Sequence, residues 1–371
     1  MLWKRLRLSL IAATILIPTA LFADTAQPDY YPWSYSSLVR AARHDEHLVI
    51  YSNLRSQPLR DGLLASFHKL YPFIHVTDVD GDGASLSLRF ARETAAQRPS
   101  ADLVLSSAMD LQEKLINDGY AQPYASPEVA FLPSWAHWKD LGYGTTYEPV
   151  VFVYNKRFIP KNEMANTHAA FEKLLKDHMQ EFQGRVATYD PHQSAVGMLF
   201  LLQDTHATRD AWNLFKLFGD VQARTYNTSL AMMQHLSKGE QWIAYNVIGS
   251  YARELQRENP DLEIVYPADY VLTMSRVAFI SARAAHPAAA KLFLDFLLSR
   301  TGQSYLIHYG MGSLRTDVNS MAGHPMSRAQ AIRIGPGLLA GLDSIVRAQF
   351  FRRWEEVNIP PANPATLDGL E

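Results

Sequence analysis

The sequence contains no cysteine in its 371 residues. Disulfide bonds are therefore excluded as a source of stability. A secreted chain can do without them when it is long enough to bury a large core, and this one is. The absence of cysteine also excludes the lipid-anchored class of secreted proteins, whose anchor is attached to a cysteine at the cleavage site.

Long apolar runs are also absent, except for one near the start of the chain. Basic residues Lys4, Arg5 and Arg7 precede the apolar run Leu8–Phe22, and Ala23 is a small residue just before Asp24. The run is shorter than the roughly 20 residues that a membrane-spanning helix needs. This order predicts a cleaved signal peptide over residues 1–23, in preference to a retained anchor. We expect a mature chain that diffuses freely in a periplasm.

The chain has no excess of positive charge. Its formal net charge is −2 and becomes −5 once the three positive charges of the signal segment are removed. A mildly acidic protein without a basic stripe is not a candidate for binding nucleic acid. The remaining chain of about 350 residues exceeds one typical hydrophobic core, so we expect two lobes or domains.

Catalytic and metal-binding motifs are missing as well. The sequence has no Gly-x-Ser-x-Gly, His-Glu-x-x-His or Walker-type loop. Its histidines are scattered, and His192 attracts notice only because it lies in a turn before a predicted helix. The segment Asp78–Gly83 imitates the start of a calcium loop, but the twelfth position holds Arg89 where a glutamate is required. We therefore expect no enzyme activity, no cofactor and no metal site.

Strand-like and helix-like segments alternate through most of the chain. The apolar run Leu48–Tyr51 is followed by a segment with apolar residues at helical spacing, then by the alternating strand pattern Ile74–Val79 and a second helical segment. Ala101–Leu105 is another buried strand by composition. This alternation predicts an α/β protein with a largely parallel sheet.

Several predicted strands stop at small hydroxyl or amide residues, and a helix follows almost at once. In an open parallel sheet, ligands bind outside the carboxyl ends of the strands, where helix N-termini attract anions. Each position alone is also explained as an ordinary helix N-cap, but the recurrence of the pattern in both halves of the chain favours a ligand cleft. The candidate ligand-binding residues of this pattern are Ser52, Asn53, Ser85, Ser106, Ser107, Ser194, Tyr245 and Asn246.

Four segments carry a resemblance to a known family: Leu48–Asn53, Ala101–Asp110, Gly239–Tyr251 and Lys291–Gln303. They resemble the periplasmic substrate-binding proteins of ATP-binding-cassette importers. The similar branch has the type II binding-protein fold and includes ferric-ion, sugar-phosphate and phosphoglycerate-type members. The resemblance extends from about residue 44 to about residue 358 and is strongest in Phe293–Gln303.

The resemblance implies two hinge-connected α/β lobes that the chain crosses twice. On this basis lobe 1 is expected over residues 44–150 and 270–371, and lobe 2 over residues 151–269. It also implies a monomer that delivers a small solute to a membrane permease and its ATPase. Two alternatives stay open: a sensory protein that signals to a membrane histidine kinase, and a secreted hydrolase that uses His192 and a nearby serine.

The resemblance leaves the solute open. Ferric-ion binders of the family carry paired tyrosines where this sequence has Gly249-Ser250-Tyr251, and Tyr30-Tyr31 lies far upstream. Iron is therefore the weaker alternative, and a small organic anion, including a phosphorylated one, suits the serine-rich strand ends better. Arg276 is a candidate countercharge, since a guanidinium binds carboxylate or phosphate with two hydrogen bonds. A salt bridge on a returning strand explains Arg276 equally well.

The signal pattern generates a first prediction. Cleavage after Ala23 makes Asp24 the first residue of the secreted protein. N-terminal sequencing of protein recovered from the periplasmic fraction should begin at Asp24. A mature protein that starts at Met1 would overturn the secretion argument.

Overall fold

The computed structural model describes residues 28–54, 56–318 and 329–358. The expected signal peptide, residues 1–23, lies outside these described residues. The chain divides into two compact units, Met1–Tyr31 and Pro32–Glu371. Within the first unit the rings of Tyr30 and Tyr31 pack edge to face, with 5.2 Å between their centroids. No helix in the described part of the chain has the length and hydropathy needed to span a bilayer.

The larger unit contains two β-sheets, and the first has the strand order β2-β1-β3-β12-β5-β4. Strands β1, β2 and β3 are parallel, while β12, β5 and β4 pair antiparallel. This sheet and the helices that pack on it are lobe 1. Its strands are β1 (His47–Ser52), β2 (His75–Asp80), β3 (Leu103–Ser106), β4 (His137–Trp138), β5 (Gly142–Gly144) and β12 (Val277–Ile280).

The helices of lobe 1 bury one face each. Helix α2 turns Leu59, Leu63 and Phe67 inward at a spacing of four residues, and Tyr71-Pro72 ends it. Helix α10 is almost wholly buried and packs against α1, α11 and β12. The helices are α1 (Tyr35–Asp45), α2 (Gln57–Leu70), α3 (Gly83–Ala95), α4 (Met109–Asn117), η1 (Pro127–Phe131), α10 (Pro287–Leu298) and α11 (Arg300–His308).

The second sheet, with its helices, is lobe 2. Its strand order is β13-β11-β6-β9-β7-β8, and β10 also pairs with β6. The strands are β6 (Glu148–Asn155), β7 (Val186–Tyr189), β8 (Arg224–Tyr226), β9 (Ile243–Ile248), β10 (Leu262–Val265), β11 (Val271–Met274) and β13 (Ala329–Ala331). The helices are η2 (Lys161–Glu163), α5 (His168–Asp177), α6 (Ala195–Ala207), α7 (Ala211–Asp220), α8 (Ser229–Lys238), α9 (Gly249–Glu258) and α12 (Ser344–Asn358).

Two short segments carry the chain directly from a strand of one sheet to a strand of the other. Crossover 1, residues 145–147, joins β5 to β6, and crossover 2, residues 275–276, joins β11 to β12. The two crossovers are hydrogen-bonded to each other. The Thr145 N–H donates to the Arg276 carbonyl at 2.9 Å, and the Arg276 N–H donates to the Thr146 hydroxyl at 2.9 Å. The hinge therefore consists of two paired segments rather than a flexible linker.

In each sheet, the strand that arrives directly from the other lobe runs antiparallel to the parallel strands of that sheet. In lobe 1 this strand is β12, which enters from crossover 2 and pairs antiparallel with β3. In lobe 2 it is β6, which enters from crossover 1 and pairs antiparallel with β9. The α/β class is confirmed, but the sheets are mixed rather than largely parallel. A strand that arrives directly from the other lobe has no crossover helix to reverse its direction.

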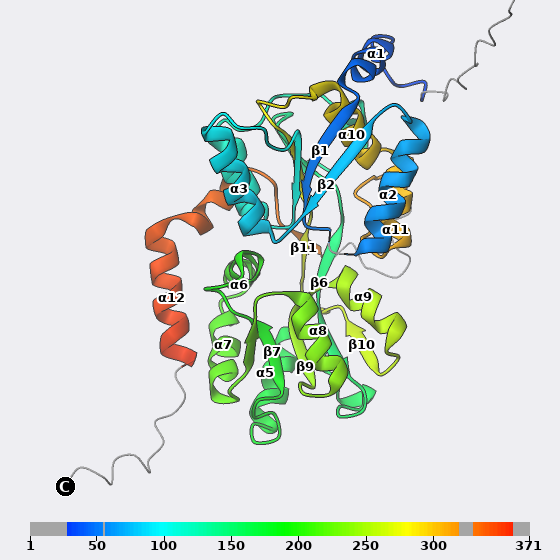
Figure 1. Ribbon diagram of the computed structural model, residues 1–371. Coiled ribbons are helices and arrows are strands. Elements are labelled where there is room, and N and C mark those ends of the chain that lie inside the picture. The colour runs from blue at the N-terminus through cyan, green and yellow to red at the C-terminus, as the bar shows by residue number, and fades with distance from the viewer. Residues whose placement is uncertain (1–27, 55, 319–328, 359–371) are drawn as a thin grey trace, which may run out of the picture. The chain divides into compact units, whose positions relative to one another are not determined.

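The C-terminal segment differs from the expected lobe assignment. We expected residues 270–371 to lie in lobe 1. The segment η4 (Pro336–Leu342) does pack on α4 of lobe 1. Helix α12, however, packs on α7 of lobe 2, beside which it lies in Figure 1. Aromatic rings make the second contact: Trp354 lies 5.6 Å from Phe215 and Phe350 lies 5.1 Å from Trp212. The lobe on which a terminal helix packs depends on such tertiary contacts, and no local sequence pattern reveals them.

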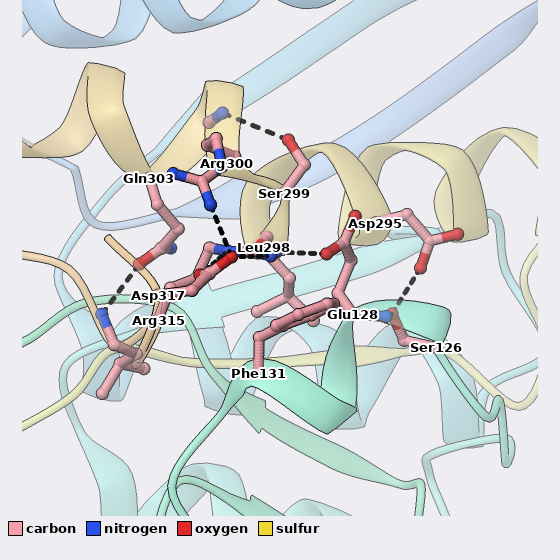
Figure 2. A network of polar contacts seen from close by, with 12 residues as sticks. Ser126, Glu128, Phe131, Asp295, Leu298, Ser299, Arg300, Gln303, Arg315 and Asp317 are labelled. Carbon is pink, nitrogen blue, oxygen red and sulfur yellow. Dashed lines mark hydrogen bonds and ion pairs between the residues drawn. The ribbon is translucent and has the colours of Figure 1, made fainter. Parts of the chain in front are cut away.

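A buried polar network lies in lobe 1 beneath α10 and α11 (Figure 2). The guanidinium of Arg315 contacts the Glu128 carboxylate, donates to the Leu298 carbonyl at 3.1 Å and pairs with Asp317 at 2.7 Å. The side chains of Arg315 and Glu128 are 1% and 0% exposed. Nearby, burial raises the pKa of Asp295 to about 7, although three hydroxyls that donate to it act in the opposite direction.

This network generates a stability prediction with a built-in control. Arg315→Met leaves the Glu128 carboxylate buried without its guanidinium, which should lower the free energy of unfolding by about 3–5 kcal/mol. Arg300 also pairs with Asp317, at 2.8 Å, but is 63% exposed. Arg300→Met should therefore cost about 0–1 kcal/mol. Urea unfolding of both variants measures the two losses in free energy of unfolding. Equal losses would contradict the conclusion that the buried Arg315 pair stabilises the fold more than the exposed Arg300 pair.

Candidate functional site

A cavity of about 260 Å³ lies between the two lobes. Its wall is built from the loops and helix starts that follow strands of both sheets. The lobe 1 residues are Asn53, Asp82, Gly83, Ala84, Ser107 and Ala108. The lobe 2 residues are Tyr189, Gln193, Ser194, Ala195, Val196, Asn227, Thr228, Ser229, Leu230, Ile248 and Tyr251.

Helix N-termini converge on this cavity from both sides. Helices α3, α6 and α8 begin at the wall, and their N-caps Asp82, Ser194 and Thr228 each accept a hydrogen bond from the backbone N–H three residues on. The first N–H groups of these helices remain without an acceptor among the described residues. They belong to Gly83, Ala84, Ala195, Val196, Ser229 and Leu230, all of which line the cavity. Such groups are ready donors to an anion.

Hydroxyl and amide groups add to these donors. The Asn53 amide donates to the Ser107 hydroxyl at 2.8 Å and accepts from the Ser107 N–H at 3.1 Å. The Ser194 hydroxyl accepts from the Gly197 N–H at 3.1 Å. The hydroxyls of Ser107 and Ser194 therefore both serve as acceptors within the protein, which leaves their own protons available to a solute.

The backbone of Gly83 lies close to the loop after β3, which belongs to the same lobe. A Cβ atom at this position would lie 2.6 Å from the Ser106 hydroxyl and 3.0 Å from the Ala108 side chain. Any larger residue would displace the loop after β3. Glycine is thus required for the start of α3 to come within reach of the cavity.

Backbone N–H groups give the cavity positive character. Among the described residues that line it, none is lysine, arginine or histidine, and one, Asp82, is acidic. Three helix dipoles directed at one cavity supply a positive potential without a cation.

The structure brings together three of the residues that the sequence singled out. Asn53, Ser107 and Ser194 line the cavity, and they come from opposite lobes, far apart in the chain. They follow β1, β3 and β7, at the carboxyl ends of these strands.

Three other candidates make contacts outside the cavity. The Ser52 hydroxyl donates to Asp78 at 2.8 Å, and the Ser106 hydroxyl accepts from the Ala108 N–H at 3.2 Å. The Ser85 N–H is held by the N-cap carboxylate of Asp82, and its side chain is exposed. None of these three residues lines the cavity.

Tyr245 and Asn246 belong to a separate buried cluster. Both donate to the Asp204 carboxylate, at 2.9 and 2.6 Å, and Tyr270 donates to its other oxygen at 2.9 Å. Burial raises the pKa of Asp204, and the three donors oppose that shift. We expected β9 to end at Asn246, but the strand continues to Ile248 with Asn246 at φ 59°. The Asn246 side chain is therefore directed into lobe 2 instead of the cavity.

Arg276 lies behind the cavity wall and is not among the lining residues. Its side chain is 0% exposed and pairs with the equally buried Glu148 at 2.9 Å. The expected alternative, a salt bridge on a returning strand, matches this contact, except that the pair is buried rather than at the surface.

Some lining residues were missed by the sequence analysis. Asn227, Thr228 and Ser229 follow the three-residue strand β8, which is too short and exposed to stand out by composition. The small polar residues before α8 were the available signal. Tyr189 and Tyr251 were also not predicted to line the cavity. The sequence pattern places Tyr189 at the end of a buried strand, and Tyr251 was considered only as a metal ligand.

Comparisons with known proteins agree with this geometry. The family model described as bacterial extracellular solute-binding protein matches residues 98–327. No curated protein matches the sequence. The crystal structure of the substrate-binding protein of an ABC transporter from Agrobacterium tumefaciens is 34% identical, with a TM-score of 0.78, and the match covers 84% of this chain and 94% of that one.

Two less similar structures share the fold. AfuA from Actinobacillus pleuropneumoniae, with fructose-6-phosphate bound, is 18% identical with a TM-score of 0.68, over 84% of this chain and 98% of that one. Iron-bound HitA from Pseudomonas aeruginosa is 17% identical with a TM-score of 0.65, over 84% and 99%. The expected type II fold with two hinge-connected lobes is thus confirmed. The chain belongs to the bacterial extracellular solute-binding proteins and is a substrate-binding protein of the ABC-transporter type.

Proposed function

We propose that this protein captures a small organic anion, preferably a phosphate ester, in the cavity between its lobes. The observation that carries the proposal is the convergence of three helix N-termini with free N–H groups on one cavity. A tetrahedral phosphate group presents several acceptor oxygens in different directions, so it can accept from α3, α6 and α8 together. The bound fructose-6-phosphate of AfuA supports the same solute class.

The size and polarity of the cavity support a small solute. A volume of about 260 Å³ lies just below the usual range for drug-sized ligands and leaves room for more than a bare ion. The polar lining residues Gln193, Asn227 and Thr228 offer hydrogen-bond partners to the hydroxyl groups of a solute. We infer a solute with one anionic end and a hydroxyl-bearing remainder.

The biological setting follows from the family. Family members act outside the cytoplasm, and we propose the periplasm for this chain, with release after removal of the signal segment. We further propose a monomer that passes its solute to a membrane permease powered by an ATPase. A role in signalling to a sensor kinase would use the same cavity, and an adjacent permease or kinase gene would distinguish the two.

A catalytic role for His192 has little support. Its ring stacks on Phe351 at 4.3 Å between centroids, and its Nε2 atom lies 3.4 Å from a Glu355 carboxylate oxygen. It is half exposed and is not a lining residue of the cavity. We therefore assign it a structural contact with α12.

Solute identity can be tested directly. Protein purified without refolding is examined by native mass spectrometry for a bound small molecule, and then titrated with fructose 6-phosphate, glycerol 3-phosphate, inorganic phosphate and ferric citrate. The proposal expects saturable binding of at least one phosphate ester. Binding restricted to ferric citrate would overturn it.

Serine substitutions generate the next prediction. Ser107→Ala and Ser194→Ala each remove a hydrogen bond to a charged solute group, worth about 1.5–3 kcal/mol, so calorimetry should show affinity weakened about tenfold or more. Ser194→Ala should also lower stability by about 1 kcal/mol, because Ser194 caps α6. Ser85→Ala is the matched control, since it changes an exposed serine of α3 and should leave the affinity unchanged. Stability loss with unchanged affinity in both lining variants would mean that they are caps only.

Iron binding generates a separate prediction. Two tyrosines line the cavity, but burial raises the pKa of Tyr189, and its hydroxyl is hydrogen-bonded to Ser229. The described residues contain no group of three or more histidines, cysteines or acids that could hold a metal ion. Ferric citrate should therefore produce no visible phenolate-to-iron band in the apo-protein. A strong band that Tyr251→Phe abolishes would restore the ferric-ion alternative.

A further inference from the structure

The Arg276 side chain is placed where the two lobes and the cavity wall meet. It belongs to crossover 2, between β11 of lobe 2 and β12 of lobe 1. It is among the largest fully buried side chains among the described residues. A guanidinium in such a position must have acceptors for its donors, so its partners show what it holds.

Its hydrogen bonds reach both lobes. Nη1 donates to the carbonyl and to the side-chain oxygen of Asn53, both at 2.9 Å. Nη2 donates to the Tyr251 hydroxyl at 3.2 Å. Asn53 follows β1 of lobe 1, and Tyr251 lies in α9 of lobe 2. Both residues line the cavity, so one buried side chain holds a wall residue from each lobe.

The remaining donors of Arg276 are directed to Glu148, the first residue of β6 after crossover 1. Nε donates to Oε1 at 2.9 Å, and Nη2 lies 3.4 Å from Oε2. The same carboxylate accepts from the Thr146 hydroxyl at 2.8 Å and from the Ser250 hydroxyl of α9. All the N–H donors of the guanidinium are thus directed at protein acceptors, which leaves none for a solute.

We propose that Arg276 is a positioning residue that couples the lobe orientation to the solute contacts of Asn53 and Tyr251. If the lobes rotate about the crossovers, Asn53 and Tyr251 move apart, and Arg276 cannot keep both within hydrogen-bond distance. The complete set of bonds therefore forms in one orientation only. A solute that contacts both wall residues favours that orientation, and by linkage the Arg276 bonds strengthen solute binding to the same extent. This inference rests on the proposed function of the cavity.

The role differs from direct recognition and from simple stabilisation. Direct recognition needs a guanidinium donor exposed to the cavity. Simple stabilisation predicts changes in melting temperature without changes in lobe orientation. The positioning role predicts that the lobe distance changes when the Tyr251 hydroxyl is removed, although Tyr251→Phe introduces no buried charge.

The first experiment needs no solute. Because the chain has no cysteine, Lys114→Cys on α4 and Lys173→Cys on α5 place one spin label on each lobe at exposed positions. Electron-resonance distance distributions are measured for this labelled protein and for its Tyr251→Phe and Arg276→Lys versions. The matched control is Tyr266→Phe, which also removes a hydroxyl that accepts from an arginine of α9, Arg253, at 2.9 Å.

The expected result is a broader distribution, or one shifted to longer distances, for Tyr251→Phe and no change for Tyr266→Phe. Arg276→Lys should show the same change if it folds, and Tyr251→Phe decides the matter if it does not. A Tyr251→Phe distribution identical to that of the unsubstituted protein would overturn the proposal.

The second experiment uses fructose 6-phosphate as the probe. Dissociation constants are measured for Arg276→Lys, Tyr251→Phe and the double variant. If Arg276 acts through Tyr251, the loss in the double variant is clearly smaller than the product of the single losses. Losses that multiply would show that Arg276 does not act through Tyr251 and would overturn the proposal. If the unsubstituted protein binds no phosphate ester, the proposed function fails, while the distance measurement still decides the role of Arg276.

Discussion

The buried ion pair between Arg276 and Glu148 is the interaction on which the rest of the structure depends. Each partner stands at one crossover, where the chain leaves one sheet for the other, and neither side chain is exposed. Removing either would leave a charge in the interior, at a cost of about 3–5 kcal/mol. Because the same two side chains also hold Asn53, Ser250 and Tyr251, the pair fixes where the cavity walls stand relative to the hinge.

The fold itself directs helix N-termini, which attract anions, at the cavity. Parallel strands of both sheets end at the cleft, and the helices that follow begin there with N–H groups that have no acceptor among the described residues. These donors cannot be deprotonated in the physiological range or swing away as a lysine side chain can.

The C-terminal segment adds a further link between the lobes. After β13 the chain returns to lobe 1, where the Ile334 N–H donates to the Trp135 carbonyl at 2.9 Å and η4 packs on α4. It then ends on lobe 2, with Trp354 and Phe350 against α7. The lobes are thus joined by packed segments on more than one side of the cleft, which limits the orientations that the hinge can reach.

The sequence by itself determined the α/β class, the family and the strand ends that border the cleft. The class and the strand ends follow from local periodicity and from short polar stretches such as Asn53, Ser107 and Ser194, whereas the family follows from the resemblance of four segments. Only the tertiary structure decided which polar residues line the cavity. Asn246 turns into lobe 2 because β9 continues past it, and Arg276 lies behind the wall because Glu148, 128 positions away, lies beside it. Contacts between residues far apart in the sequence decide where such side chains point, and no local sequence pattern predicts those contacts.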